Sequence, residues 1–104
     1  MSSPKVTIKT ISAEDIRLLF NHEGYAQLAA DGTFSVRVVR EGHPSPTKSG
    51  EPFCTRSQIL AYLNTSGHRM ALVHQYLRPD GKLGASGQPD PKKMFYKGVL
   101  YTVR

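Results

Sequence analysis

The segment RMALVHQYLR, residues 69–78, constrains the fold of this chain more than any other. In an extended segment successive side chains point to opposite faces, so Met70 and Leu72 share one face while Ala71 and Val73 share the other. Apolar side chains on both faces are typical of a central strand that is covered on both sides. The sequence therefore predicts a β-sheet with this segment in its interior.

Three further stretches have the pattern of strands. Residues 6–11 alternate and are rich in β-branched side chains, and residues 99–103 read VLYTV. Asp31-Gly32 stands between the strand-like runs YAQLAA and TFSVRVVRE, and this dipeptide is the strongest short signal for a hairpin turn. A two-stranded hairpin around residues 31 and 32 is predicted, with Phe34, Val36 and Val38 on one face.

Two main helices are predicted from capping signals. Ser12 precedes Asp15 by three residues, the spacing of a capping box, and Gly24 is placed to end the helix that follows. Thr55 is placed to cap a second helix that runs to about Asn64. The stretch between residues 42 and 52 is rich in Pro, Gly and Ser and is predicted to be an exposed loop.

A short third helix and a possible anion cradle are predicted near the C-terminus. Asp90 suits an N-cap and Pro91 the first helical position, so a helix is expected to run to about Lys97, with Gly98 closing it. The glycine-rich residues 81–87 precede this helix start. Backbone N–H groups of such a loop and of a helix N-terminus can bind an anion.

These elements give one α+β domain over residues 1–104. Its sheet is mostly antiparallel, with two main helices and a short C-terminal helix. No apolar run is long enough for a membrane span, and the first residues lack the apolar stretch of a secretory signal. A single cysteine forms no internal disulfide. We therefore expect a cytoplasmic protein without a membrane partner.

The positive charge is concentrated in the second half of the chain. The net charge is +6, yet residues 1–52 hold six basic and six acidic groups, whereas residues 53–104 hold eight basic groups against two carboxylates. Such asymmetry favours a polyanionic partner, and nucleic acid is the leading interpretation, through phosphate contacts without base readout. The predicted contact residues are Arg69, Arg78, Lys82, Lys92, Lys93 and Lys97.

Enzymatic chemistry is the weaker alternative. His74, Tyr76 and Arg78 alternate along one strand face, an order that suits a metal-independent ribonuclease of the toxin type, with the imidazole as acid or base. A half-buried structural histidine fits the same pattern. Cys54 beside Arg56 at a predicted helix start is a second candidate, and a small buried thiol is its simpler interpretation. The spacing of His and Cys predicts no metal site, and no cofactor motif is present.

The C-terminal segment HQYLRPDGKLGASGQPDPK, followed by GVLY, resembles a tail shared by small uncharacterised bacterial proteins. The resemblance covers about a quarter of the chain. It implies a bacterial origin and a meaningful C-terminal unit, and it implies no activity. A protein-interaction module, with a homodimer formed through an exposed strand edge as one form, is the remaining alternative for the function.

Overall fold

The computed structural model describes residues 6–43, 50–84 and 87–104. Within these ranges, two helices and six strands form an α+β domain. In chain order the elements are β1 (Thr7–Ile11), α1 (Ala13–His22), α2 (Tyr25–Ala30), β2 (Ser35–Gly42), β3 (Arg56–Leu63), β4 (Arg69–Leu77), β5 (Asp90–Tyr96) and β6 (Val99–Val103).

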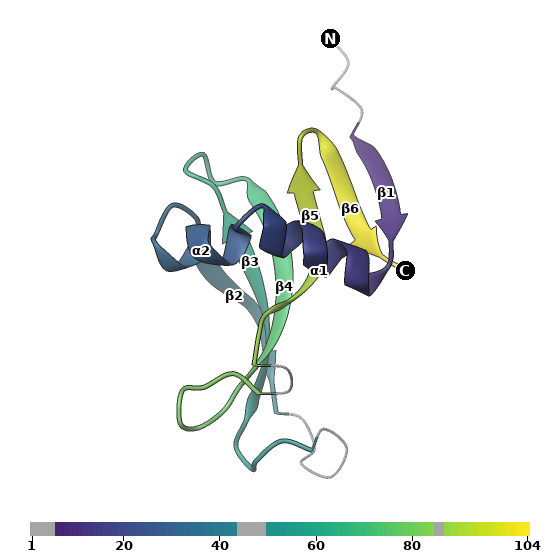
Figure 1. The fold of residues 1–104 in the computed structure, drawn as a ribbon. Helices are drawn as coiled ribbons and strands as arrows, with labels where there is room; N and C mark the ends of the chain where they lie inside the picture. Colours follow the sequence, from purple (N-terminus) through teal and green to yellow (C-terminus); the bar gives the residue numbers. More distant parts are fainter. Residues whose placement is uncertain (1–5, 44–49, 85–86) are drawn as a thin grey trace.

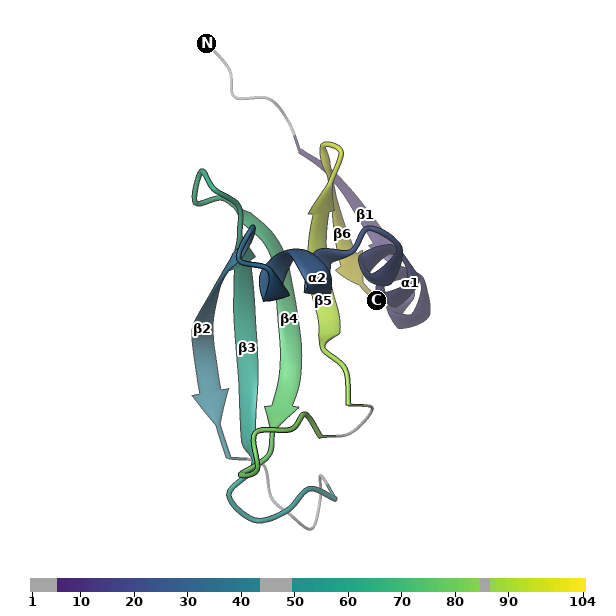
Figure 2. The ribbon, with the colours of Figure 1, turned by 60° about the vertical axis from the view of Figure 1, so that its left-hand side comes forward.

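All six strands belong to one sheet with the order β1-β6-β5-β4-β3-β2. Every neighbouring pair is antiparallel except β1 and β6, which are parallel. The segment RMALVHQYL forms β4 and lies between β3 and β5, which confirms the interior position that its two apolar faces predicted. Both helices lie on the same side of this sheet (Figures 1 and 2).

Helix α1 joins the sheet through a core on that side. The Ser12 hydroxyl accepts a hydrogen bond from the Asp15 backbone N–H (3.0 Å), which confirms the predicted cap. Gly24 follows the helix in the left-handed conformation, as predicted. Ile16 and Phe20 of α1 are buried against the sheet, where Val73 and Met94 are fully buried as well. We call this side the helix face.

The predicted hairpin around Asp31-Gly32 is wrong. Its first arm, YAQLAA, forms helix α2, and only its second arm forms a strand, β2. The six residues contain three Ala, and Ala has the highest helix propensity. The Asp31 carboxylate accepts a hydrogen bond from the Thr33 N–H (2.9 Å), so the Asp-Gly pair turns the chain out of a helix.

The helix predicted from Thr55 to Asn64 is also wrong, because Arg56–Leu63 forms strand β3. This strand lies between β2 and β4 and is buried over Leu60, Ala61 and Tyr62 in succession. A run of consecutive apolar residues suits either a buried strand or a buried helix. Asn64 and the residues to His68 then form the turn to β4, where the Asn64 side chain accepts hydrogen bonds from two backbone N–H groups.

The short helix predicted over residues 90–97 is strand β5, so Asp90 is not an N-cap. Pro91 is buried in the strand opposite Val73, and the pairing with β4 shifts at the next residue. A proline donates no ladder hydrogen bond, and such an irregular position tolerates it. Lys97 and Gly98 both have positive φ, 48° and 78°, and link β5 to β6 in a tight hairpin.

This turn gives a testable consequence for Gly98. A Cβ at Gly98 meets no atom within 4 Å, so the cost of a substitution comes from its φ of +78°. We expect Gly98→Ala to lower the free energy of unfolding by about 1 kcal/mol and Gly98→Val by more. Chemical denaturation measures both, and equal stability of all three proteins would contradict the assigned turn.

Neither helix among the described residues is long and apolar enough to cross a membrane.

Candidate functional site

The face of the sheet opposite the helices carries a row of side chains that crosses all six strands. The pairing registers place Arg37 of β2 beside Ala61 of β3, then Leu72 of β4 and Lys93 of β5. Thr102 of β6 and Thr10 of β1 complete the row. Both described helices pack on the helix face, and we call the opposite side of the sheet the open face. In this row Arg37, Lys93 and Thr10 are exposed, whereas Ala61 is buried.

A second row of apolar residues lies next to the first on the open face. Phe95 of β5 pairs with Leu100 of β6, and Leu100 pairs with Ile8 of β1, which is 63% exposed. Phe95 and Leu100 line a shallow pocket of about 350 Å³ together with Met70, Leu72 and both Arg69 and Lys93. The open face therefore combines an apolar depression with cations at its rim.

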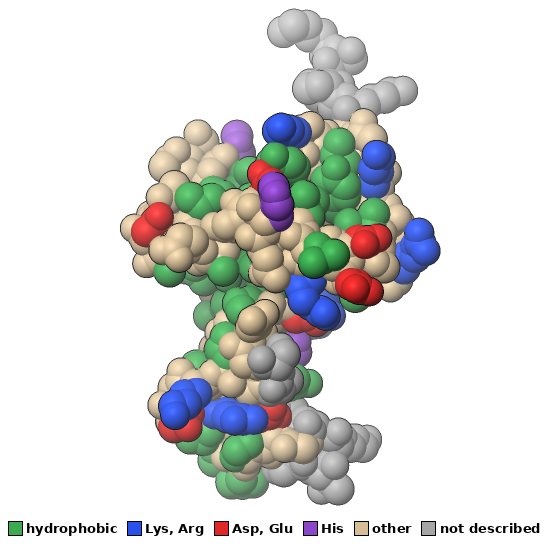
Figure 3. Space-filling model, viewed as in Figure 1, with side chains coloured by type: hydrophobic (Ala, Val, Ile, Leu, Met, Phe, Trp, Pro, Cys, Tyr) green, Lys and Arg blue, Asp and Glu red, His purple; other side chains and the backbone are tan. Residues whose placement is uncertain are grey.

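The cations of the open face have no acidic partners. Arg37, Arg69 and Lys93 are exposed, and none forms an ion pair within the described part of the chain. Glu41 lies on β2 and Asp90 on β5, where it pairs with His74, and the other carboxylates lie at the start of α1, after both helices and in the loops. On the helix side, acidic and basic side chains lie interspersed over the surface (Figure 3). Positive charge without nearby compensation attracts a polyanion.

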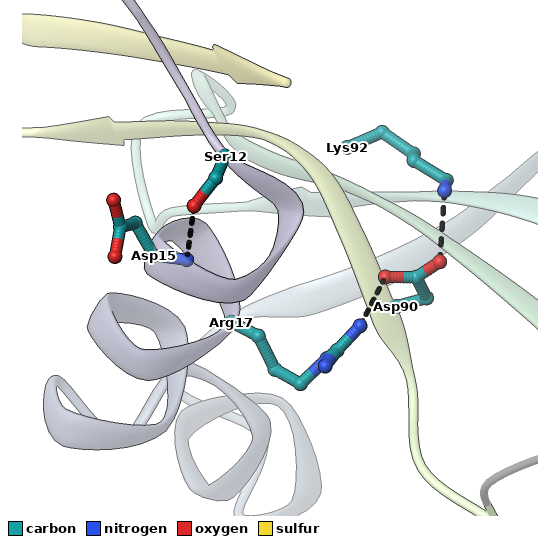
Figure 4. A network of polar contacts seen from close by, with 5 residues as sticks. All are labelled: Ser12, Asp15, Arg17, Asp90 and Lys92. Atoms are coloured by element: carbon teal, nitrogen blue, oxygen red, sulfur yellow. Dashed lines mark hydrogen bonds and ion pairs between the residues drawn. The ribbon is translucent and has the colours of Figure 1, made fainter. Parts of the chain in front are cut away.

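Lys92 is a neighbour of Lys93 in sequence but is engaged differently. It lies where the pairing of β5 with β4 shifts, and its ammonium group binds the Asp90 carboxylate at 2.8 Å. The guanidinium of Arg17 on α1 approaches the other oxygen of the same carboxylate at 3.9 Å (Figure 4). The Asp90 carboxylate thus compensates two cations. Lys92 therefore adds less to the positive potential of the open face than its place in the sequence suggested.

Arg78 is committed to a carboxylate of its own chain. Its Nε donates a hydrogen bond to Glu51 Oε2 at 2.8 Å, and the Glu51 side chain is only 3% exposed. The Glu51 carboxylate lies against Gly84, in the space that a Cβ there would fill. Gly84 in turn donates its N–H to the Tyr76 carbonyl.

This arrangement changes the interpretation of the glycine-rich loop. The predicted cradle for an external anion required a helix N-terminus at Asp90, and that helix does not exist. In the described part of the loop, the anion beside Gly84 is the carboxylate of Glu51. Residues 85 and 86 of the loop, and residues 44–49 of the loop predicted at 42–52, lie outside the described residues.

Lys82 and Lys97 lie at opposite ends of the sheet. Lys82 belongs to the turn after β4, where its N–H binds the Asp80 carboxylate, and Lys97 belongs to the β5–β6 turn (Figure 1). The ammonium group of Lys97 lies 5.3 Å from the centre of the Tyr96 ring. Of the six residues predicted to contact phosphate, the structure brings together Arg69 and Lys93, which line one pocket.

His74 lies further along the open face, half-buried, with Nε2 sharing a hydrogen bond with Ser57 Oγ at 2.9 Å. Its ring stands edge-on to Tyr76. Burial of the ring lowers the pKa of His74, the charge of Lys92 lowers it further, and Asp90 opposes both. Burial of the ring and the charge of Lys92 thus favour the neutral imidazole. The guanidinium that lines the small pocket beside His74 is that of Arg17, while Arg78 is bound to Glu51.

Cys54 is not at a helix start, because β3 replaces the predicted helix. It is exposed and has a positive φ of 69° in the turn before the strand. Among the described residues, no three His, Cys, Asp or Glu side chains are grouped to hold a metal ion.

Arg37 and Arg40 are not among the predicted contact residues, because they belong to the half of the chain whose charges balance. Arg40 pairs with Ile59 in the row next to Arg37, on the same open face. The alternation of Val36, Arg37 and Val38 already separated this arginine from the apolar side of its strand. That alternation was the available signal, and only the pairing of strands shows that Arg37 and Lys93 share one surface.

Comparison of the chain with protein-family models, with curated proteins and with solved structures found no match.

Proposed function

We propose that this protein binds nucleic acid on the open face of its sheet, through phosphate contacts that do not depend on sequence. The observation that carries the proposal is the row across the sheet in which Arg37 and Lys93 are both exposed on one face and neither forms an ion pair with another described residue. Basic side chains on a common surface supply the sequence-independent part of nucleic-acid affinity.

The spacing of the cations suits an extended polyanion. Arg37 and Lys93 are three strands apart in the row, which corresponds to about 14 Å at the usual distance between strands. Arg69 stands at the pocket rim beside Lys93, and Arg40 lies in the adjacent row. Between them, Ala61 is buried and Leu72 is partly buried, and neither side chain carries a charge.

A homodimer paired through the edge strand β2 is less well supported. When two copies of β2 pair in antiparallel fashion about Arg37, or about the point midway between Arg37 and Arg40, with the sheet faces continuous, Arg37 stands opposite Arg37 or Arg40 of the second copy. Like charges directly opposite each other destabilise a strand pair. The pairing irregularity between Val38 and Arg40 further disrupts this edge. Charged residues and bulges of this kind protect edge strands from addition of a further strand.

Replacing both central cations tests the proposal. We expect Arg37→Gln combined with Lys93→Gln to weaken binding to a fluorescein-labelled 12-nucleotide DNA of mixed sequence. The slope of log affinity against log salt concentration should become shallower by about 1.4, because each phosphate contact on a single strand contributes about 0.7. Fluorescence anisotropy between about 50 and 200 mM salt measures the slope.

The matched control is Lys82→Gln combined with Lys97→Gln, which removes the same charge from the two ends of the sheet. This variant should keep the wild-type slope. If both double variants lose equal affinity, binding follows net charge and the open face is not the interface. Absence of binding by the wild-type protein at low salt would refute the function itself.

A further inference from the structure

We propose that the bound nucleic acid is single-stranded and that one unpaired base occupies the pocket beside Phe95. This inference rests on the proposed function and names its ligand more narrowly. The pocket is lined by the apolar side chains of Met70, Leu72, Phe95 and Leu100, and Arg69 and Lys93 stand at its rim. This lining matches an occupant that has both an apolar part and an anionic part. A nucleotide with its base exposed meets both conditions.

The register of β5 brings the two chemistries within reach of one nucleotide. Lys93 and Phe95 are two residues apart in a stretch with regular pairing to β6, so they point to the same face. Two residues of a strand span about 6.6 Å. At that separation the ammonium group of Lys93 can contact a phosphate while the ring of Phe95 stacks on the base of the same nucleotide.

A duplex does not fit this pocket as well. In double-stranded DNA or RNA the faces of the bases are stacked inside the helix, and only phosphates, sugars and base edges reach a protein surface. Exposed bases of single strands instead stack on aromatic side chains, a contact that is independent of sequence because every base has an aromatic face. The pocket volume of about 350 Å³ is at the lower end of the ~300–1,000 Å³ of small-molecule sites and suits one base.

The decisive comparison uses two single-stranded DNA probes of 12 nucleotides, identical in phosphate number, one with bases and one in which every residue is abasic. The wild-type protein should bind the probe with bases about 10-fold more tightly than the abasic probe, because stacking of one base on an aromatic ring contributes binding free energy of that order. Phe95→Leu keeps an apolar side chain of similar size but removes the ring. We expect it to abolish this difference while its affinity for the abasic probe stays at the wild-type value.

The outcomes separate the two proposals. If the wild-type protein binds neither probe, nucleic-acid binding itself is wrong. If it binds both probes equally, or binds a 12-base-pair duplex more tightly than the single strand, phosphate contact stands and the base pocket is wrong. Phe53→Leu is the matched control, because Phe53 is 79% exposed and outside the open face. If Phe53→Leu abolishes the difference in affinity between the two probes, the base stacks on Phe53 and the pocket beside Phe95 is not its site. Thermal unfolding of each variant verifies that it is folded.

Discussion

Phe20→Ala is expected to lower the free energy of unfolding by about 3 to 5 kcal/mol, enough to unfold a marginal domain. Phe20 is 1% exposed and lies where α1, α2 and the sheet meet. Its ring centre is 5.9 Å from those of both Tyr25 on α2 and Tyr62 on β3. Truncation removes buried apolar area and leaves a cavity that these two rings cannot fill without moving.

Chemical denaturation monitored by circular dichroism measures this loss. Leu18→Ala on the same helix is the control, because Leu18 is 60% exposed and its truncation should change stability by about 0.5 kcal/mol or less. A Phe20→Ala protein as stable as the Leu18→Ala protein would show that α1 does not pack on the sheet in the way described.

Gly84→Ala is expected to lower the free energy of unfolding by about 2 to 4 kcal/mol. A Cβ at this position would occupy the space of the Glu51 carboxylate, so this side chain must shift, which disturbs its hydrogen bond with Arg78. The Glu51 side chain is only 3% exposed, so a displaced carboxylate loses its partner in a poorly solvated site, although Arg78 itself is 37% exposed.

The control for Gly84 is Gly42→Ala. At Gly42 a Cβ meets no atom within 4 Å and φ is not positive, so this substitution should leave stability nearly unchanged. Glu51→Asp shortens the carboxylate side chain by one methylene and makes room for a Cβ. In the Glu51→Asp background Gly84→Ala should therefore cost less than in the wild type. Additive effects of the two substitutions would count against direct contact between them.

Elements whose signals are local could be predicted from the sequence. The Ser12 cap, the central strand β4 and the final strand β6 follow from a side-chain oxygen at the right spacing or from alternating apolar residues. The α+β class with a mostly antiparallel sheet follows from their order. At these positions the local signal and the tertiary packing favour the same structure, so the local signal alone was sufficient to predict the element.

The three errors have a common physical cause. In residues 25–30, 56–63 and 90–96 a short local signal was opposed by the packing of the whole sheet. Asp-Pro at residues 90 and 91 is a good helix start in isolation, yet the adjacent strands β4 and β6 both pair with this segment. Consecutive apolar residues in β3 carry no period that separates a helix from a buried strand.

The candidate site shows the same limit. The cations of the second half were found by counting charge, but counting cannot tell Lys93, on the open face, from Arg78, which is bound to Glu51. Nor can it join Arg37 to Lys93, because their common face depends on the pairing of four strands. The surface is a property of the sheet register, and the sequence does not display that register.

The parallel pairing of β1 with β6 has a consequence for the order in which the protein assembles. Thr10 and Thr102, whose hydroxyls meet across this pair, are 92 residues apart in the chain, and Arg104 donates its N–H to the Ile11 carbonyl. Each of the other strand pairs joins residues much closer in sequence. Closing so long a loop carries a large entropy cost, which only contacts already made elsewhere can offset. During synthesis β1 is made before β6 and must wait for it, so the strand with the exposed Ile8 stays unpaired until β6 has left the ribosome.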